Sequence, residues 1–558
     1  MMKMKRLKIY LLAMLPLAFV TFSCDEEDAI LEQQLKDNPL PEAPSGDPGV
    51  LDFSQYVAIG NSLAAGVMDG ALYTDGQNHS IPALLAAQFQ ISGVGGGSFN
   101  QPDINSVNGY SGPGPDGQPG TSDDQGRFLL SLALAKPVPT PGELPTAYGG
   151  NKAELNNFGV PGMRITEVLS PSLANNPYYA RFASAPGTST VLGDALATSP
   201  TFFTYWLGSN DILQYAIGGG SNESLITSAQ DFQDALSQSL GALVQSGAEG
   251  VVLTLPPYVL LPYFRAVPYN AIPMTDANVV AQLNAAFSGL NRALDGLVQV
   301  SQQSPLVNVS QQEADRRKVS YALGANPILI KDDALVDFDR PGGEFDILLA
   351  LQLITPAERQ ALAPYGQSRP ATANDLPTLA SASVLGTAVG GNAQALVGIT
   401  VPAADNLILS ASEVQTVVGT RAQFNAIIAG VVAGINAQSN GSITLVDVQP
   451  AFADLFGLSP AAARFLIDPS QGTNQALEAM GEAAAAQADG QLGLEVDGHN
   501  LRPDFAPNGV FSTDGVHPNP RGNAIIANLI IDALNTTRGA NIPHVNVIAL
   551  RGIVATDL

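Results

Sequence analysis

One serine, one histidine and one aspartate stand at turns where they could act together on a carbonyl group. Ser62 follows Asn61 and the short apolar run Tyr56–Gly60, which is typical of a buried parallel strand that ends in a tight turn. Asp514 and His517 lie in the run Asp-Gly-Val-His-Pro, just before an expected helix. Ligands of open α/β sheets gather at the carboxyl ends of strands, so Ser62 stands where a nucleophile would be useful. A plain helix N-cap is the alternative reading of this serine.

Acyl transfer needs these residue types. A serine hydroxyl is a poor nucleophile until a base takes its proton, and imidazole, with a pKa of about 6.5 in water, makes His517 the natural base. Asp514, three residues earlier, could hold the imidazole in one tautomer. The backbone N–H groups of Ser62 and Gly162, with the Asn210 amide, could stabilise the oxyanion, and losing one such donor typically costs about 3–4 kcal/mol.

Four blocks in this order resemble the SGNH (GDSL-type) hydrolase family. The blocks are Gly60-Asn61-Ser62-Leu63, Gly162, Gly208-Ser209-Asn210-Asp211 and Asp514-Gly-Val-His517. The resemblance implies a flavodoxin-like three-layer α/β/α sandwich, ester substrates, catalytic Ser62, Asp514 and His517, and neither cofactor nor metal. Asn61 stands where the family usually has Asp, which keeps hydrogen bonding but not the charge. The chain has no Gly-x-Ser-x-Gly elbow, which disfavours the ordinary α/β-hydrolase fold.

The amino-terminal residues resemble a bacterial lipoprotein signal. A basic start and the apolar run Ile9–Phe22 predict a signal peptide over residues 1–23. Cys24 follows at once, which indicates lipidation there; a secretory signal with an incidental cysteine is the alternative. The acidic run Asp25–Asp28 resembles the export tag of surface lipoproteins in Bacteroidetes-type bacteria, and residues 24–50 form a Pro-rich tether. We therefore expect a lipid-anchored protein of the bacterial cell envelope, at the outer membrane or cell surface.

Composition excludes several other classes. The chain has 558 residues, with 50 Asp and Glu against 25 Lys and Arg, a net charge of −25. Such a surface repels phosphate backbones, so we expect no nucleic-acid partner. Cys24 is the single cysteine, which excludes an intrachain disulfide and a structural thiolate metal site.

The regular elements predict one large domain over residues 51–558 with two long irregular insertions, about 91–150 and 304–410. Strands alternate with helices along the chain, which indicates a parallel sheet with crossover helices. We expect strands at Tyr56–Gly60, Thr201–Leu207, Gly250–Pro256 and Ser442–Val448, and helices at Ile81–Phe89, Met163–Leu169, Ser228–Gln245, Thr275–Gln302, Ser412–Ala437 and Pro520–Leu534.

The insertions are rich in Gly, Pro and small polar residues. Long loops of this kind in a compact domain are usually functional or disordered. We expect the two insertions to form a cap over the end that carries Ser62 and His517, with decoration of a far flank as the alternative. Two strands, Lys318–Ala322 and Pro327–Lys331, and a helix near Thr355–Leu362 are expected in the second insertion. In the first insertion Asp116, Asp123 and Asp124 could hold calcium, although their spacing is more typical of a solvated turn.

The remaining polar candidates carry weaker signals. His79 could line the pocket, and His499 is more typical of a surface residue than of a metal ligand. Asp211 could anchor the oxyanion loop or cap a helix. Trp206 is expected in the core rather than at a binding surface.

The sequence therefore predicts hydrolysis of a carboxylic ester through an acyl-Ser62 intermediate. Lipid-like acyl esters and O-acetylated glycans are the two substrate classes left open. A surface binding lipoprotein that keeps the fold without turnover is the alternative from another class.

Overall fold

The structure is a computed structural model that describes residues 44–134, 136–460, 462–463 and 493–556. The expected signal peptide, Cys24 and most of the 24–50 tether lie outside these described residues. A compact unit begins at Gly46. There the Gly46 N–H donates to the Ser92 carbonyl and Asp47 forms a bridge with Asn541. The folded part therefore starts a few residues before position 51.

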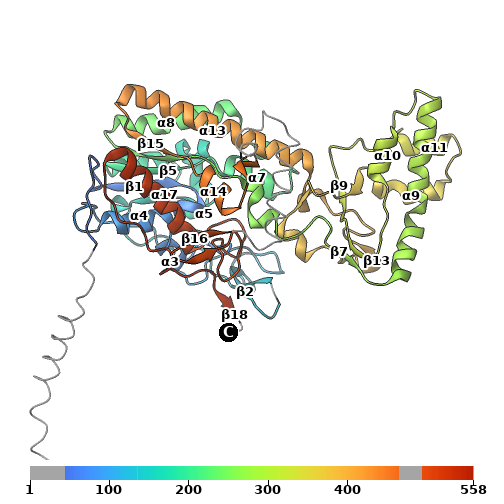
Figure 1. The fold of residues 1–558 in the computed structure, drawn as a ribbon, viewed down its shortest axis with the longest axis horizontal. Coiled ribbons are helices and arrows are strands. Elements are labelled where there is room, and N and C mark those ends of the chain that lie inside the picture. Colours follow the sequence, from blue (N-terminus) through green and yellow to red (C-terminus); the bar gives the residue numbers. More distant parts are fainter. Residues whose placement is uncertain (1–43, 135, 461, 464–492, 557–558) are drawn as a thin grey trace, which may run out of the picture. The chain divides into compact units, whose positions relative to one another are not determined.

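Five parallel strands form the central sheet, in the order β15-β6-β5-β1-β4 (Figure 1). Their bounds are β1 Tyr56–Gly60, β4 Asn157–Gly159, β5 Phe202–Trp206, β6 Glu249–Leu253 and β15 Ile443–Val446. β1 and β5 are buried along their whole length, as expected where helices cover both faces of a parallel sheet. Gly60 pairs with both Gly159 and Trp206, so β1, β4 and β5 end level with one another.

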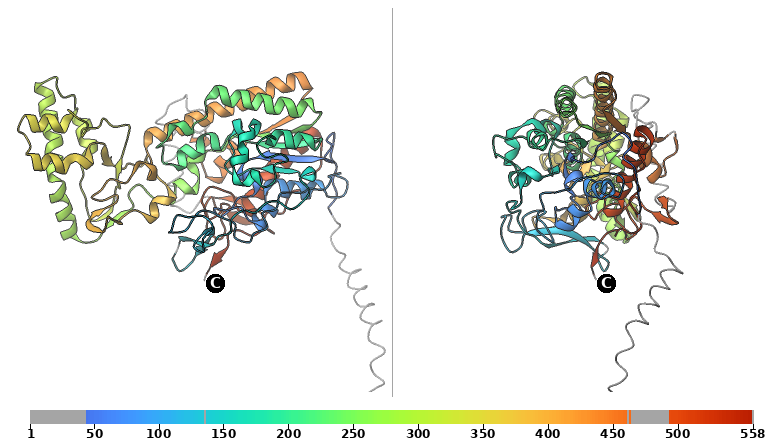
Figure 2. Two further views of the ribbon diagram at one scale, coloured as in Figure 1. Left: turned by 180° about the vertical axis from the view of Figure 1, so that it is seen from behind. Right: turned by 90° about the vertical axis from the view of Figure 1, so that its left-hand side faces the viewer.

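Helices cover both faces of this sheet (Figures 1 and 2). α4, Ile81–Phe89, packs with α17, Pro520–Arg538, and α8, Ala229–Gln245, packs with α13, Ala411–Ser439. The shorter helices beside the sheet are α2 Ser62–Ala65, α3 Thr74–Asn78, α5 Pro177–Ala180, α6 Val191–Ala197, α7 Asn210–Ile217 and α14 Gln449–Leu455. The expected three-layer α/β/α sandwich is confirmed.

Helix α13 is long and apolar enough, by length and composition alone, to cross a membrane. It packs against α8, α7 and β15, and Val414, Phe424 and Ile428 are buried there. About a third of its most apolar window is buried in the structure, so α13 contacts the sandwich along one face.

The first insertion is more regular than expected. Residues Gln125–Ser131 form β2, Lys136–Pro141 form β3, and β2 also pairs with β18, Ala555–Thr556, near the carboxyl terminus. A second small pair, β16 Leu494–Val496 and β17 His499–Leu501, precedes the Asp514 loop.

The second insertion has a hydrophobic core of its own, from Ile272 to Ile408. Its helices are α9 Ala277–Gln303, α10 Gln311–Arg317, α11 Glu344–Ala350 and α12 Pro356–Leu362. Its strands are β7 Ile272–Met274, β8 Gly324–Asn326, β9 Leu329–Lys331, β10 Ser368–Pro370, β11 Leu376–Pro377, β12 Ala388–Val389, β13 Asn392–Leu396 and β14 Ile408–Leu409. Because α9 packs in this core, the expected boundary at 304 falls too late by more than one helix.

One local expectation in this insertion is wrong. The segment Lys318–Ala322 is not a strand, because its N–H groups at Val319 and Tyr321 donate to the Asn291 and Asn284 side chains of α9 instead of to a neighbouring strand. The apolar side chains of α11 do not cover the catalytic end. Phe345, Leu348 and their neighbours pack in the second core itself.

Candidate active site

Ser62 is the first residue of α2 and stands directly after the turn that ends β1. The Asn61 side chain accepts a hydrogen bond from the Leu63 N–H at 3.1 Å and so caps this short helix. An amide at position 61 therefore preserves the turn without a charge. The turn is tight because β4 lies close to α2. A Cβ on Gly159 would come within 2.3 Å of the Ala65 backbone nitrogen.

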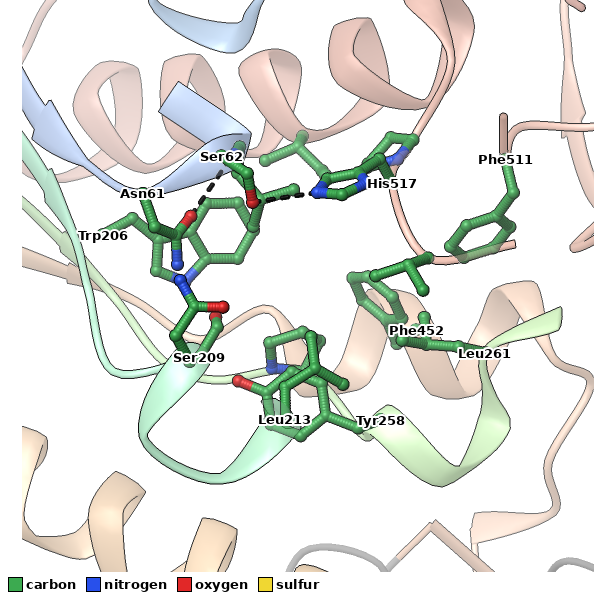
Figure 3. Close-up of a pocket in the computed structure, with 16 residues that line it drawn as sticks. Asn61, Ser62, Trp206, Ser209, Leu213, Tyr258, Leu261, Phe452, Phe511 and His517 are labelled. Atoms are coloured by element: carbon green, nitrogen blue, oxygen red, sulfur yellow. Dashed lines mark hydrogen bonds between the residues drawn. The ribbon is translucent and has the colours of Figure 1, made fainter. Parts of the chain in front are cut away.

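Ser62, His517 and Asp514 are joined by two short hydrogen bonds. His517 Nε2 lies 2.8 Å from Ser62 Oγ, and His517 Nδ1 lies 2.8 Å from Asp514 Oδ2. An aspartate on Nδ1 places the proton there, which leaves Nε2 as the acceptor for the serine proton. Figure 3 shows the Ser62 and His517 side chains pointing toward one another at one edge of a cavity. Ser62 and His517 are 455 positions apart in the sequence. The structure brings them together with Asp514, as the sequence predicts.

The Asp514 carboxylate is held ionised. Burial alone would raise its pKa, but the charge and hydrogen bonds of His517, together with the Val516 N–H, outweigh burial and lower the pKa to about 2. Its Oδ1 accepts the Val516 and His517 N–H groups, and its Oδ2 also accepts the Gly70 N–H at 2.9 Å. These donors fix the carboxylate against the imidazole.

A second aspartate, Asp69, positions the loop that carries Asp514. Its buried carboxylate accepts the Thr513 N–H at 3.0 Å and the Tyr73 hydroxyl at 2.8 Å. The Asp69 N–H donates to Ser512 Oγ at 3.0 Å, so the two loops are linked in both directions. Asp69 has a φ of 54°, a left-handed conformation that aspartate tolerates better than most residues. The loop after α2 therefore sets the place of the Asp–His pair.

Two further residues expected to stabilise an oxyanion stand at the ends of β4 and β5. Asn210 begins α7, donates from Nδ2 to the Met163 carbonyl at 3.0 Å and lines the cavity beside Ser62. One amide hydrogen of Asn210 therefore remains for a ligand. Gly162 has a φ of 82°, which favours glycine. Of these two residues, only Asn210 is among the described residues that line the cavity with Ser62.

Asp211 ties these two turns together. It is fully buried, and its carboxylate accepts the Ile165 N–H at 3.0 Å and the Thr227 hydroxyl at 2.6 Å. Burial raises its pKa to about 6, against the lowering effect of these donors. Of the two roles considered for Asp211, the contact with Ile165 is that of an anchor for the Gly162 turn. That turn leads into a 3₁₀ helix at Ile165–Leu169, shorter and tighter than the α-helical segment expected.

The cavity beside Ser62 is mainly apolar and has a volume of about 450 Å³, its open mouth included (Figure 3). Its described lining is Asn61, Ser62, Leu63, Trp206, Ser209, Asn210, Leu213, Pro256, Tyr258, Leu261, Phe452, Phe511, Val516, His517, Pro518 and Ile526. None of these belongs to 91–150 or 304–410, so the expected cap does not line the cavity. The first insertion instead contacts the loop that carries Asp514, because the Phe128 carbonyl accepts a hydrogen bond from the Thr513 hydroxyl. Trp206 is buried as expected, but it also lines the cavity.

The other polar candidates lie elsewhere. His79 Nδ1 contacts Asp75 rather than the cavity, so a pocket role for His79 is wrong. His499 contacts its own turn through the Asp497 carbonyl. Asp123 accepts the Asp116 N–H, a turn contact. Within the described ranges no group of three His, Cys, Asp or Glu residues is placed to hold a metal ion.

The apolar lining was missed from the sequence. Phe452, Phe511 and Ile526 have the pattern of ordinary core residues, and they are buried. Nothing in their spacing separates a cavity wall from a packed core. Asp69 carries a weak signal in the sequence. It precedes a glycine shortly after Ser62, and an Asp-Gly pair is typical of a turn.

One family model matches the chain, that of the GDSL-like lipases and acylhydrolases, over residues 56–322. The match includes Ser62, Gly162 and Asn210 and ends well before Asp514 and His517. The fold places His517 in hydrogen-bond contact with Ser62 all the same. No curated protein and no solved structure matches the chain significantly. The match agrees with the SGNH hydrolase fold seen here, and it supports a hydrolase that acts on esters.

Proposed function

We propose that the chain is a serine esterase of the SGNH type that cleaves carboxylic esters through an acyl-Ser62 intermediate. The observation that carries the proposal is the pair of 2.8 Å contacts from His517, one to Ser62 and one to Asp514, at the edge of an apolar cavity. A matched acylhydrolase family over the serine-bearing half of the chain agrees with it.

The proposed reaction has two steps. Ser62 Oγ attacks the ester carbonyl carbon while His517 Nε2 takes the hydroxyl proton, and collapse of the tetrahedral intermediate breaks the C–O bond and releases the alcohol with that proton. Water then attacks the acyl-serine ester, His517 takes a proton from the water and returns it to Ser62, and the carboxylic acid leaves. Asp514 stabilises the imidazolium that forms in each step.

The oxyanion would be held by hydrogen-bond donors around Ser62. The Ser62 N–H stands at the start of α2, where a helix leaves its first N–H groups unpaired. The second amide hydrogen of Asn210, which the Met163 carbonyl does not accept, would supply another donor beside the end of the neighbouring strand. Donors that are fixed before the reaction stabilise developing charge without reorganisation.

Two alternatives remain distinct proposals. A glycan O-acetyl esterase would use the same residues on a small acyl group, and a non-catalytic surface binder would keep the fold without turnover. The serine, base and aspartate are all present and in hydrogen-bond contact, which favours turnover.

An ester panel tests the proposal. Purified wild type and Ser62→Ala would be assayed on acetyl to long-chain acyl esters and on O-acetylated glycans. We expect hydrolysis by wild type and loss of it in Ser62→Ala, whose melting temperature should match wild type because α2 keeps its Asn61 cap. Equal activity of the two proteins would exclude the serine mechanism.

We further propose that Cys24 carries a lipid anchor that holds the enzyme at the cell envelope. The support is the sequence pattern alone: a basic start, an apolar run and a cysteine followed by acidic residues. Mass spectrometry of the amino-terminal peptide of the native protein tests it. An unmodified Cys24, or cleavage at another position, would contradict it.

A further inference from the structure

A second apolar cavity adjoins the one beside Ser62. Four residues line both: Phe452, Phe511, Pro518 and Ile526. The second cavity has a volume of about 400 Å³, the open space at its mouth included. Beyond the shared residues, its described lining is Ala451, Leu455, Leu494, Val510, Gly522, Ile525 and Leu529. The two cavities are therefore neighbours, and a path from Ser62 to the aliphatic side chains of the second cavity would pass these four shared residues.

The aromatic residues at the junction are held in place by a third ring. The Phe456 ring centroid lies 6.5 Å from that of Phe452 and 6.1 Å from that of Phe511. Phe452 and Phe511 are themselves buried. Rings packed in this way have defined rotamers, so the junction is a built feature of the fold.

The chemistry of the second cavity excludes a polar occupant. All of its described lining side chains are apolar, so a sugar hydroxyl placed there would lose its hydrogen bonds to water and gain none. A hydrocarbon chain gains by leaving water in the same place, by about fourfold in binding for each buried methylene.

We propose that this path binds a hydrocarbon chain of the ester, so that the preferred substrates are lipid-like esters and not glycan acetates. This inference rests on the proposed function, because the chain is placed by its bond to the carbonyl that Ser62 attacks. The chain extends from the first cavity between Phe452 and Phe511 and ends against Ile525 and Leu529. The acyl chain and the alcohol chain share this chemistry, and the experiment separates them.

Blocking the far cavity tests the inference. Ala451→Phe places a ring in the second cavity from α14, and Ile525→Trp does so from α17; both residues are half-buried and line only this cavity. Asp454→Phe adds the same ring to an exposed position of α14 and is the matched control. Each protein would be assayed on p-nitrophenyl esters from acetate to laurate, and on alkyl acetates from methyl to dodecyl.

Wild type should prefer long chains in one of the two series by at least about tenfold in kcat/KM. Each blocking variant should remove that preference and hydrolyse the shortest ester within about twofold of the wild-type rate. The control Asp454→Phe should behave like wild type on every ester. Preference in the acyl series assigns the acyl chain to the path, and preference in the alkyl series assigns the alcohol chain.

Three results would overturn the inference: no length preference in wild type, an equal loss on short and long esters in both blocking variants, or glycan acetates as the best substrates. Labelling of Ser62 by a small fluorophosphonate is measured in every variant. Absence of labelling and of all hydrolysis in wild type would instead contradict the proposed function, so the two failures are distinguishable.

Discussion

The two larger hydrophobic cores of this chain differ in how their charged side chains are paired. In the second core, Arg369 is paired with Asp332 and Asp375, and the three side chains are 9%, 6% and 0% exposed. Most Arg or Lys pairs with carboxylates in the described residues lie between 292 and 375. At the edge of the sheet core, one Asp–His pair is aimed at Ser62.

This difference separates stability from chemistry. None of the described residues that line the Ser62 cavity belongs to the second core. Charges that satisfy one another inside the second core hold that region together, whereas the imidazole at the sheet edge keeps one nitrogen for the reaction. Substitutions in the two regions should therefore affect different measurements.

The largest expected effect is on catalysis at the sheet edge. In Asp514→Asn the amide can still accept the N–H groups of Val516 and His517, but it cannot fix the imidazole tautomer or stabilise imidazolium. We expect kcat to fall by about 10³–10⁴-fold, together with a modest fall in melting temperature because the variant loses the stabilising contribution of the ionised carboxylate. A steady-state assay measures this, and a loss below tenfold would contradict the role of Asp514.

The pKa of Asp514 adds a pH dependence to this account. Its folded pKa of about 2 lies below the ordinary value of 3.8, so the carboxylate stabilises the fold above about pH 4, and that contribution is lost as pH falls toward 2. Asp514 therefore stays ionised under assay conditions.

The next expected effect is on stability in the second core. Arg369→Met leaves Asp332 and Asp375 buried without their cation, so we expect destabilisation of about 3–5 kcal/mol. Arg292→Met is the control, because Arg292 and its partner Glu358 are 66% and 39% exposed, and loss of such a pair costs up to about 1 kcal/mol. Denaturant unfolding measures both.

The activity of Arg369→Met tests whether the second core affects the active site. At a temperature where Arg369→Met is folded, its kcat per fluorophosphonate-labelled site should equal that of wild type. A large drop in kcat per labelled site would show that the second core shapes the active site after all.

How far the sequence could predict these regions follows from what each side chain does. Ser62, Asn210 and the Asp514–His517 pair could be found because polar residues at strand ends interrupt an otherwise apolar pattern. Phe452 and Ile526 could not, because a cavity wall and a packed core need the same side chains. The sequence does not show which core α9 covers, because its amphipathic period would be the same in either. Its place in the second core depends on contacts with residues distant in sequence.

The smallest expected effect concerns two carboxylates, Asp405 in the 3₁₀ helix Asp405–Leu407 and Glu413 in the first turn of α13. Burial, with the negative charge of Asp333 near Asp405 and of Asp405 near Glu413, raises the pKa of Asp405 to about 6 and that of Glu413 to about 7. Raised folded values mean that stability is fully present below about pH 4 and is lost as pH rises through 6 to 7. We expect the melting temperature to decline from pH 5 to 8.

Glu413→Gln isolates this contribution. Glutamine at this position can keep the capping box with Ser410, so the variant removes the charge and preserves the helix start. The decline in melting temperature should be smaller than in wild type, by on the order of 1–2 °C. Identical pH profiles for the two proteins would contradict the raised pKa of Glu413.

The central claim is that Ser62, activated by His517, becomes the acylated residue. The most direct measurement is mass spectrometry of tryptic peptides after reaction of the full-length protein with a fluorophosphonate, in wild type, Ser62→Ala and His517→Ala. We predict one adduct on the peptide that contains Ser62, none in Ser62→Ala, and labelling slowed by at least about 10³-fold in His517→Ala. An adduct on another residue, or equally fast labelling without His517, would contradict the account.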